Sequence, residues 1–191
     1  MRTCIATLTL LALAFAAAPA FADPVGDLNQ ALHAFSQIKS VHTDVTSPGG
    51  EASIDQIGAH KMRYSATIMG RQMQVVRINA DSWVNVGGHW THDNYGQNPM
   101  FTQIGAAQNA IMHQKNVGDG YIVTNAGTVT VNGVSGTKYH LVDKDNHERA
   151  ADVIIGPNHL PLQLIFDTKS GEGATATYSQ YNSVADFGPP Q

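Results

Sequence analysis

Two short segments of the sequence combine side chains that could bind a metal ion. His89 and His92 are three residues apart, and imidazole is a common zinc ligand. We expect this segment to lie in a strand or turn, where the two rings point to different faces, so we predict a solvated hairpin and no metal site. The run Asp143–Glu148 begins like a calcium loop, but Glu148 stands where that loop needs glycine, and Ile154 where it needs a bidentate glutamate. We predict a charged hairpin turn there.

The patterns that mark nucleophiles and phosphate sites are incomplete. Ser135 lies between Gly133 and Gly136, one residue short of a nucleophile elbow, and its surroundings predict a turn between two strands. The segment Gly118–Gly120 precedes a predicted strand, whereas phosphate-binding loops open a helix. We therefore predict no catalytic residue, no cofactor and no enzymatic activity. A hydrolase that uses scattered polar residues stays open as an alternative.

The first 22 residues have the pattern of an export signal. Arg2 is followed by an apolar run from Ile5 to Ala17, and Ala20-Phe21-Ala22 is typical of a signal-peptidase site. The run is shorter than the roughly 20 residues that span a membrane. Cys4, the single cysteine, precedes the run, whereas a lipid-anchor cysteine would follow it. We predict a cleaved signal peptide (1–22) and one soluble, periplasmic domain (23–191).

Charge and composition narrow the classes of partner. The chain of 191 residues has 11 basic and 15 acidic residues and a formal net charge of −4, with the signs mixed along the sequence. A nucleic-acid-binding protein would show a basic stripe, which this sequence does not. We expect no nucleic-acid partner and a monomer.

The elements that must position any site are two helices and a series of short strands. Pro24 follows Asp23 as a first helical residue follows a cap, and the predicted helix ends near Lys39. A second helix is predicted from about Pro99 to His113. Alternating or β-branched runs, separated by Gly, Pro or Asn, predict strands near 41–46, 51–57, 61–69, 71–79 and 82–86, and a further antiparallel meander over the last sixty residues.

This order of elements predicts an α+β domain. About ten strands form a curled antiparallel sheet, an incomplete β-barrel, covered by two helices on its concave side. The 18 glycines suit the bends that curvature needs. Such a sheet can be filled solid or can enclose an apolar cavity.

The sequence resembles the periplasmic lipoprotein carrier superfamily, the LolA-like proteins, which includes the mycobacterial lipid-binding lipoproteins. The resemblance rests on the hairpin from Trp83 to Trp90, on Gly133-Val134 with Tyr139, and on Ile155-Gly156 with Leu160-Pro161. It covers nearly all of the predicted mature chain. It implies an incomplete barrel whose apolar cavity holds acyl chains.

The function implied is binding or carriage of a lipid, an acylated lipoprotein or another acyl-chain amphiphile. A membrane-bound donor or acceptor protein would be the further partner. Strand parity and the resemblance together predict ligand-binding residues on both halves of the sheet and on the second helix: Tyr64, Ile68, Trp83, Ile104, Ile111, Leu164 and Phe166. A sensing or protein-interaction module with the same fold and a filled core stays open as another alternative.

Overall fold

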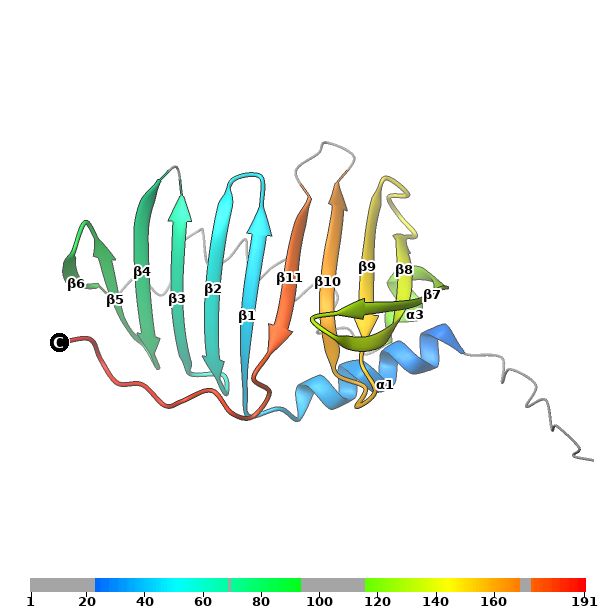
Figure 1. Ribbon diagram of the computed structural model, residues 1–191, viewed down its shortest axis with the longest axis horizontal. Coiled ribbons are helices and arrows are strands. Elements are labelled where there is room, and N and C mark those ends of the chain that lie inside the picture. The colour runs from blue at the N-terminus through cyan, green and yellow to red at the C-terminus, as the bar shows by residue number, and fades with distance from the viewer. Residues whose placement is uncertain (1–22, 69, 94–115, 169–172) are drawn as a thin grey trace, which may run out of the picture.

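The protein is built on one eleven-stranded antiparallel sheet. The computed structural model describes residues 23–68, 70–93, 116–168 and 173–191. The strands follow the order β6-β5-β4-β3-β2-β1-β11-β10-β9-β8-β7. Figure 1 shows β6 to β9 as one open row, with β7 crossing in front of β9 and β10 in this view and α1 along the lower right. This confirms the α+β fold with a curled, unclosed sheet, with eleven strands instead of about ten.

The elements have the following bounds. The helices among the described residues are α1 (Pro24–Ser36) and the short α3 (Val117–Gly120). The first six strands are β1 (Ser40–Ser47), β2 (Gly50–Ile57), β3 (Lys61–Ile68), β4 (Arg71–Ile78), β5 (Asp81–Val86) and β6 (His89–Asp93). The last five are β7 (Tyr121–Val131), β8 (Val134–Asp143), β9 (Arg149–Ile155), β10 (Pro161–Thr168) and β11 (Ala174–Ser179).

Helix α1 forms where its sequence pattern predicts it. Pro24 occupies the first turn, where its missing N–H costs nothing, and Asp27 places a negative charge near the positive end of the helix dipole. Leu28 and Ala31 are buried against the sheet. The second predicted helix, Pro99–His113, lies outside the described residues.

Turn residues set the strand boundaries. Asn132 and Gly133 join β7 to β8 with φ of 48° and 81°, the left-handed backbone that a two-residue hairpin turn requires. Between β8 and β9, the Asp143 carboxylate accepts hydrogen bonds from the backbone N–H groups of Asp145 and Asn146, at 2.8 and 3.0 Å. The segment Asp143–Glu148 is therefore the charged hairpin turn that the sequence predicts.

One strand pair joins the two halves of the chain. Strand β1 pairs with β11 over the register from His42↔Ser179 to Thr46↔Thr175. Every other pair in the sheet joins strands that follow each other in sequence. The sheet is therefore two meanders, β1–β6 and β7–β11, that meet at β1–β11.

The C-terminal segment after β11 runs along the lower ends of β1–β4 (Figure 1). The Asn182 side chain accepts a hydrogen bond from Lys39 N at 2.6 Å, and Asn182 N donates to Ser40 O at 2.8 Å. Further on, Lys61 Nζ lies 2.5 Å from an Asp186 carboxylate oxygen. These contacts fasten the segment to the strands.

Candidate functional site

The sheet has one continuous apolar face, which we call the inner face. Antiparallel partners share a face, and the register aligns Ile54, Tyr64, Val75 and Val84 across β2–β5. In the other half it aligns Val45, Ala176, Leu164, Val153 and Tyr139 across β1, β11, β10, β9 and β8. Since Val45 also lies opposite Ala52 of β2, the two rows belong to the same face.

A first hydrophobic cluster fills the space between α1 and the inner face. Its buried members come from α1, α3 and five strands: Leu28, Ala31, Val41, Val117, Tyr139, Leu141, Ala151, Val153, Ile155, Leu164, Ala176 and Tyr178. A cavity of about 10 Å³ lies among them, lined by apolar side chains that include Leu28, Val117 and Val153. That volume is about the minimum that admits one water molecule. This part of the face is therefore packed core.

A polar contact fixes α1 on this cluster. The Tyr139 hydroxyl donates a hydrogen bond to an Asp27 carboxylate oxygen at 2.7 Å. Burial, together with this hydrogen bond and the Asp27 charge, raises the pKa of Tyr139 to about 12. The phenol therefore stays protonated and keeps donating at neutral pH.

A second cluster lies on the inner face of β2–β4. Its buried members are Ile54, Tyr64, Ala66 and Val75, with Val45, Ala52, Met62, Met73 and Val84 packed around them. No α1 residue belongs to it. Tyr64 and Val75 are only 3% and 1% exposed, so an acyl chain could reach them only after a movement that exposes this surface.

The structure brings some predicted ligand-binding residues to one face and separates others. Tyr64 belongs to the second cluster, whereas Leu164 is buried in the first and Phe166 packs against it. Trp83 lies on the opposite, outer face, because it is aligned with Val76 and not with Val75. Ile68 ends β3 opposite Arg71, and nothing beyond its backbone is described. Ile104 and Ile111 lie outside the described residues.

The two histidines that suggested a metal lie on different faces. His89 is aligned with Val86 and His92 with Trp83, which are three residues apart on β5. The His92 ring lies 5.1 Å from the Trp83 ring on the outer face. Within the described ranges, no group of three or more His, Cys, Asp or Glu side chains could hold a metal ion.

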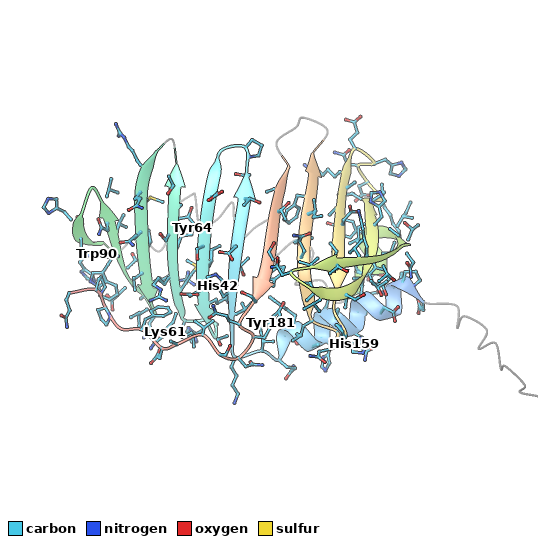
Figure 2. All side chains as sticks on the ribbon, in the orientation of Figure 1. His42, Lys61, Tyr64, Trp90, His159 and Tyr181 are labelled. Carbon is cyan, nitrogen blue, oxygen red and sulfur yellow. The ribbon has the colours of Figure 1, made fainter. Side chains whose placement is uncertain are left out.

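Sequence reasoning missed an ion-pair network on the outer face, at the lower end of β1–β3. His42 Nδ1 lies 2.6 Å from Asp55 Oδ1, and the Arg63 guanidinium donates to Asp55 Oδ2. The Phe187 ring lies 5.0 Å from the Arg63 guanidinium carbon, and Figure 2 shows His42 and Lys61 near the C-terminal segment. The three residues come from three strands, and only the alignment of His42, Asp55 and Arg63 in the register brings them together.

Burial and charge act in opposite directions on this network. Burial lowers the pKa of His42, but the hydrogen bond to Asp55 and the charges of Asp44 and Asp55 outweigh it, so the pKa is raised above the ordinary 6.5. Burial raises the pKa of Asp55, but hydrogen bonds and charges from His42 and Arg63 outweigh it, so that pKa falls below 3.8. The network is therefore fully charged between about pH 4 and 6.5.

We expect this network to contribute most to the melting temperature in the pH range where both His42 and Asp55 are charged. The His42 contribution is fully present below pH 6.5 and is lost as pH rises through the folded-state pKa. The Asp55 contribution is present above about pH 4 and is lost as pH falls through its lowered pKa. As pH rises from 5 to 9, the melting temperature of His42→Gln should therefore fall less than that of the wild type. Melting curves recorded over this pH range measure the difference.

A matched control is His60→Gln, because His60 lies at the β2–β3 turn, where its backbone carbonyl accepts a hydrogen bond from Asn79 N. The melting temperature of His60→Gln should depend on pH as that of the wild type does. Equal alkaline declines in the wild type and His42→Gln would contradict a stabilising role for the His42–Asp55 pair.

Solved structures with the same fold include two mycobacterial proteins, of which LppX is a lipoprotein. LppX of Mycobacterium tuberculosis superimposes with a TM-score of 0.66 and 17% identity, over 86% of this chain and 99% of that chain. LprF of Mycobacterium bovis gives a TM-score of 0.64 and 13% identity, over 88% of this chain and 97% of that chain. No family model and no curated protein matches the sequence.

No helix among the described residues is long and apolar enough to cross a bilayer. What the comparisons establish is the architecture: the chain shares the fold of LppX and LprF, a curled, unclosed antiparallel sheet with helices.

Proposed function

We propose that this protein is a non-enzymatic binding or carrier protein for a lipid, an acylated lipoprotein or another acyl-chain amphiphile. The observation that carries the proposal is the continuous apolar inner face, of which α1 packs on one half only. The second cluster on β2–β4 is then the surface on which acyl chains lie. The fold shared with LppX, a mycobacterial lipoprotein, supports this proposal.

The mechanism is physical. Each methylene moved from water to an apolar surface contributes about 0.8 kcal/mol, so even half of a long chain supplies several kcal/mol. Met62 and Met73 border the cluster, and their flexible thioether side chains can adapt to chains of different shape. Opening requires a movement that uncovers Tyr64 and Val75, which are buried. We keep Ile104 and Ile111 as predicted ligand contacts, although they lie outside the described residues.

The revised binding surface differs from the set of residues that the sequence predicts. Tyr64 remains in it, with Ile68 as its neighbour along β3. Leu164 and Phe166 belong to the α1 half, so we assign them to the core, and Trp83 to the outer face. We propose export to the periplasm after removal of residues 1–22, with a membrane-bound donor or acceptor protein as the further partner.

Native mass spectrometry of protein exported from its own cell tests this function. We expect the mass of the chain from Asp23 onward, with adducts that organic extraction removes and that have masses of acyl lipids. The extracted protein should then take up a fluorescent fatty acid with a saturable emission change. A protein that carries no adduct and takes up no acyl probe would instead be the filled interaction module, and turnover of an ester panel would indicate the hydrolase.

A further inference from the structure

One arginine on the inner face has a buried nitrogen without a hydrogen-bond partner among the described residues. Arg77 follows Val75 at a two-residue interval on β4, so it shares the face of the second cluster, between Met62 and Ser82 in the register. Its Nε is buried and has no hydrogen-bond partner among the described residues. By contrast, Lys61 and Lys138 each contact a carboxylate.

Leaving this group unpaired is energetically costly. A guanidinium N–H that is buried without an acceptor loses its hydrogen bonds to water, and no protein hydrogen bond replaces them. Native proteins keep such groups rarely, and a bound ligand or ion is one reason to keep them. The planar fork of an arginine fits the oxygens of a carboxylate or phosphate better than any other side chain does.

The surroundings of Arg77 indicate what such a ligand must be. Val75 and Met73 continue from Arg77 along the same face of β4, and Met62 lies beside it on β3. A ligand whose oxyanion meets Arg77 would therefore have apolar surface along the next residues of the strand, at about 6.6 Å for each two-residue step. An anionic head and an acyl tail satisfy both requirements.

We propose that Arg77 binds the oxyanion of an acyl-chain ligand, a carboxylate or a phosphate, whose chain lies along the second cluster. This inference rests on the proposed function and deepens it, because it makes the ligand an acidic amphiphile. It also sets the direction of the ligand, with its polar end at Ile78 and its chain running toward Arg71.

Arg71 offers a matched control on the same strand. It has the same parity as Arg77 but stands at the opposite end of β4, where it is exposed and lines an open groove of about 520 Å³ with Gln72, Gln74 and Asn85. Replacing it removes the same charge from the same strand without touching the end at which we place the oxyanion.

The test uses three ligands of equal chain length: hexadecanoate, hexadecyl phosphate and the neutral hexadecanol. Displacement of a fluorescent acyl probe is measured at pH 7.5 for the delipidated wild type, Arg77→Met and Arg71→Met. We expect the wild type to prefer one or both anions over the alcohol by roughly tenfold or more, the range of a charge-assisted hydrogen bond. Arg77→Met should lose that preference and keep its affinity for the alcohol, and Arg71→Met should keep both.

The melting temperature of ligand-free protein separates binding from a structural role. Because methionine removes an unsatisfied buried donor, Arg77→Met should be as stable as the wild type or more stable. A large loss of stability, with all three ligands weakened equally, would overturn the inference. So would equal wild-type affinity for the alcohol and the anions, which would leave the carrier function intact. If none of the three ligands binds, the result would contradict the proposed carrier function and therefore also the role of Arg77.

Discussion

Leu164→Ala should lower the free energy of unfolding by roughly 2–5 kcal/mol, the range for deleting a buried leucine side chain. Leu164 is fully buried, aligned between Val153 and Ala176 on the inner face of the α1 half. Leu164 does not line the cavity of about 10 Å³ in the first cluster, and its side chain is fully buried, so the substitution opens a new void. For a domain of this size, the melting temperature should fall by roughly 5–15 °C.

The control for this substitution is Val134→Ala. Val134 is 41% exposed at the β7–β8 turn, and its truncation should change the free energy of unfolding by less than about 0.5 kcal/mol. Chemical denaturation of both variants gives the comparison. If Leu164→Ala keeps the wild-type stability but loses acyl binding, then Leu164 lines a ligand cavity, as the sequence pattern predicts, and the assignment to the core is wrong.

The affinity of straight-chain fatty acids should rise about fourfold for each added methylene, and therefore roughly a thousandfold or more from ten to sixteen carbons. The reason is that every methylene laid on the second cluster leaves water. Once the chain is longer than the apolar surface of β2–β5, further methylenes stay in water and the rise should stop. Titration of delipidated protein with an even-numbered series measures both the slope and the length at which it ends.

A terminal hydroxyl provides the control for burial of the chain end. 16-Hydroxyhexadecanoate has the same head and almost the same length as hexadecanoate, but it must bury a hydroxyl without an assured partner. It should bind at least tenfold more weakly. Affinities that do not depend on chain length would show that the ligand touches the protein through its head alone, and would contradict the acyl-binding surface.

The local elements could be predicted from the sequence because local residues determine them. The strands near Val41, Glu51, Lys61, Arg71 and Ser82 are observed within one residue of their expected starts. Glycine or asparagine with positive φ ends most of them. The four-residue α3 was missed, because one turn is too short for any helical periodicity.

The placement of side chains on the two faces could be predicted only in part. Parity within β3 correctly groups Tyr64 with Ala66. Parity within β5 cannot reveal that Trp83 faces away from Tyr64, since that depends on how β5 aligns with β4. The pairing of β1 with β11, and the meeting of His42, Asp55 and Arg63, depend on the same long-range alignment. Arg77 becomes a candidate ligand-binding residue only once the structure shows that its Nε is buried without a partner among the described residues.

The pairing of β1 with β11 is the boundary between the two meanders, and each apolar cluster lies mainly on one side of it. The second cluster draws its buried residues from β2–β4 alone, whereas the first draws them from β8–β11 together with β1, α1 and α3. Each meander closes its own short loops, whereas β1 and β11 are far apart in sequence, so we expect their encounter to carry the largest loop-closure entropy cost in folding. Helix α1 precedes β1 in the chain, so it belongs to the same segment as the first meander, but it packs on the second. Segments 23–93 and 116–191, produced separately, would therefore carry complementary surfaces, and their recombination would be a reporter of folding that single-chain experiments lack.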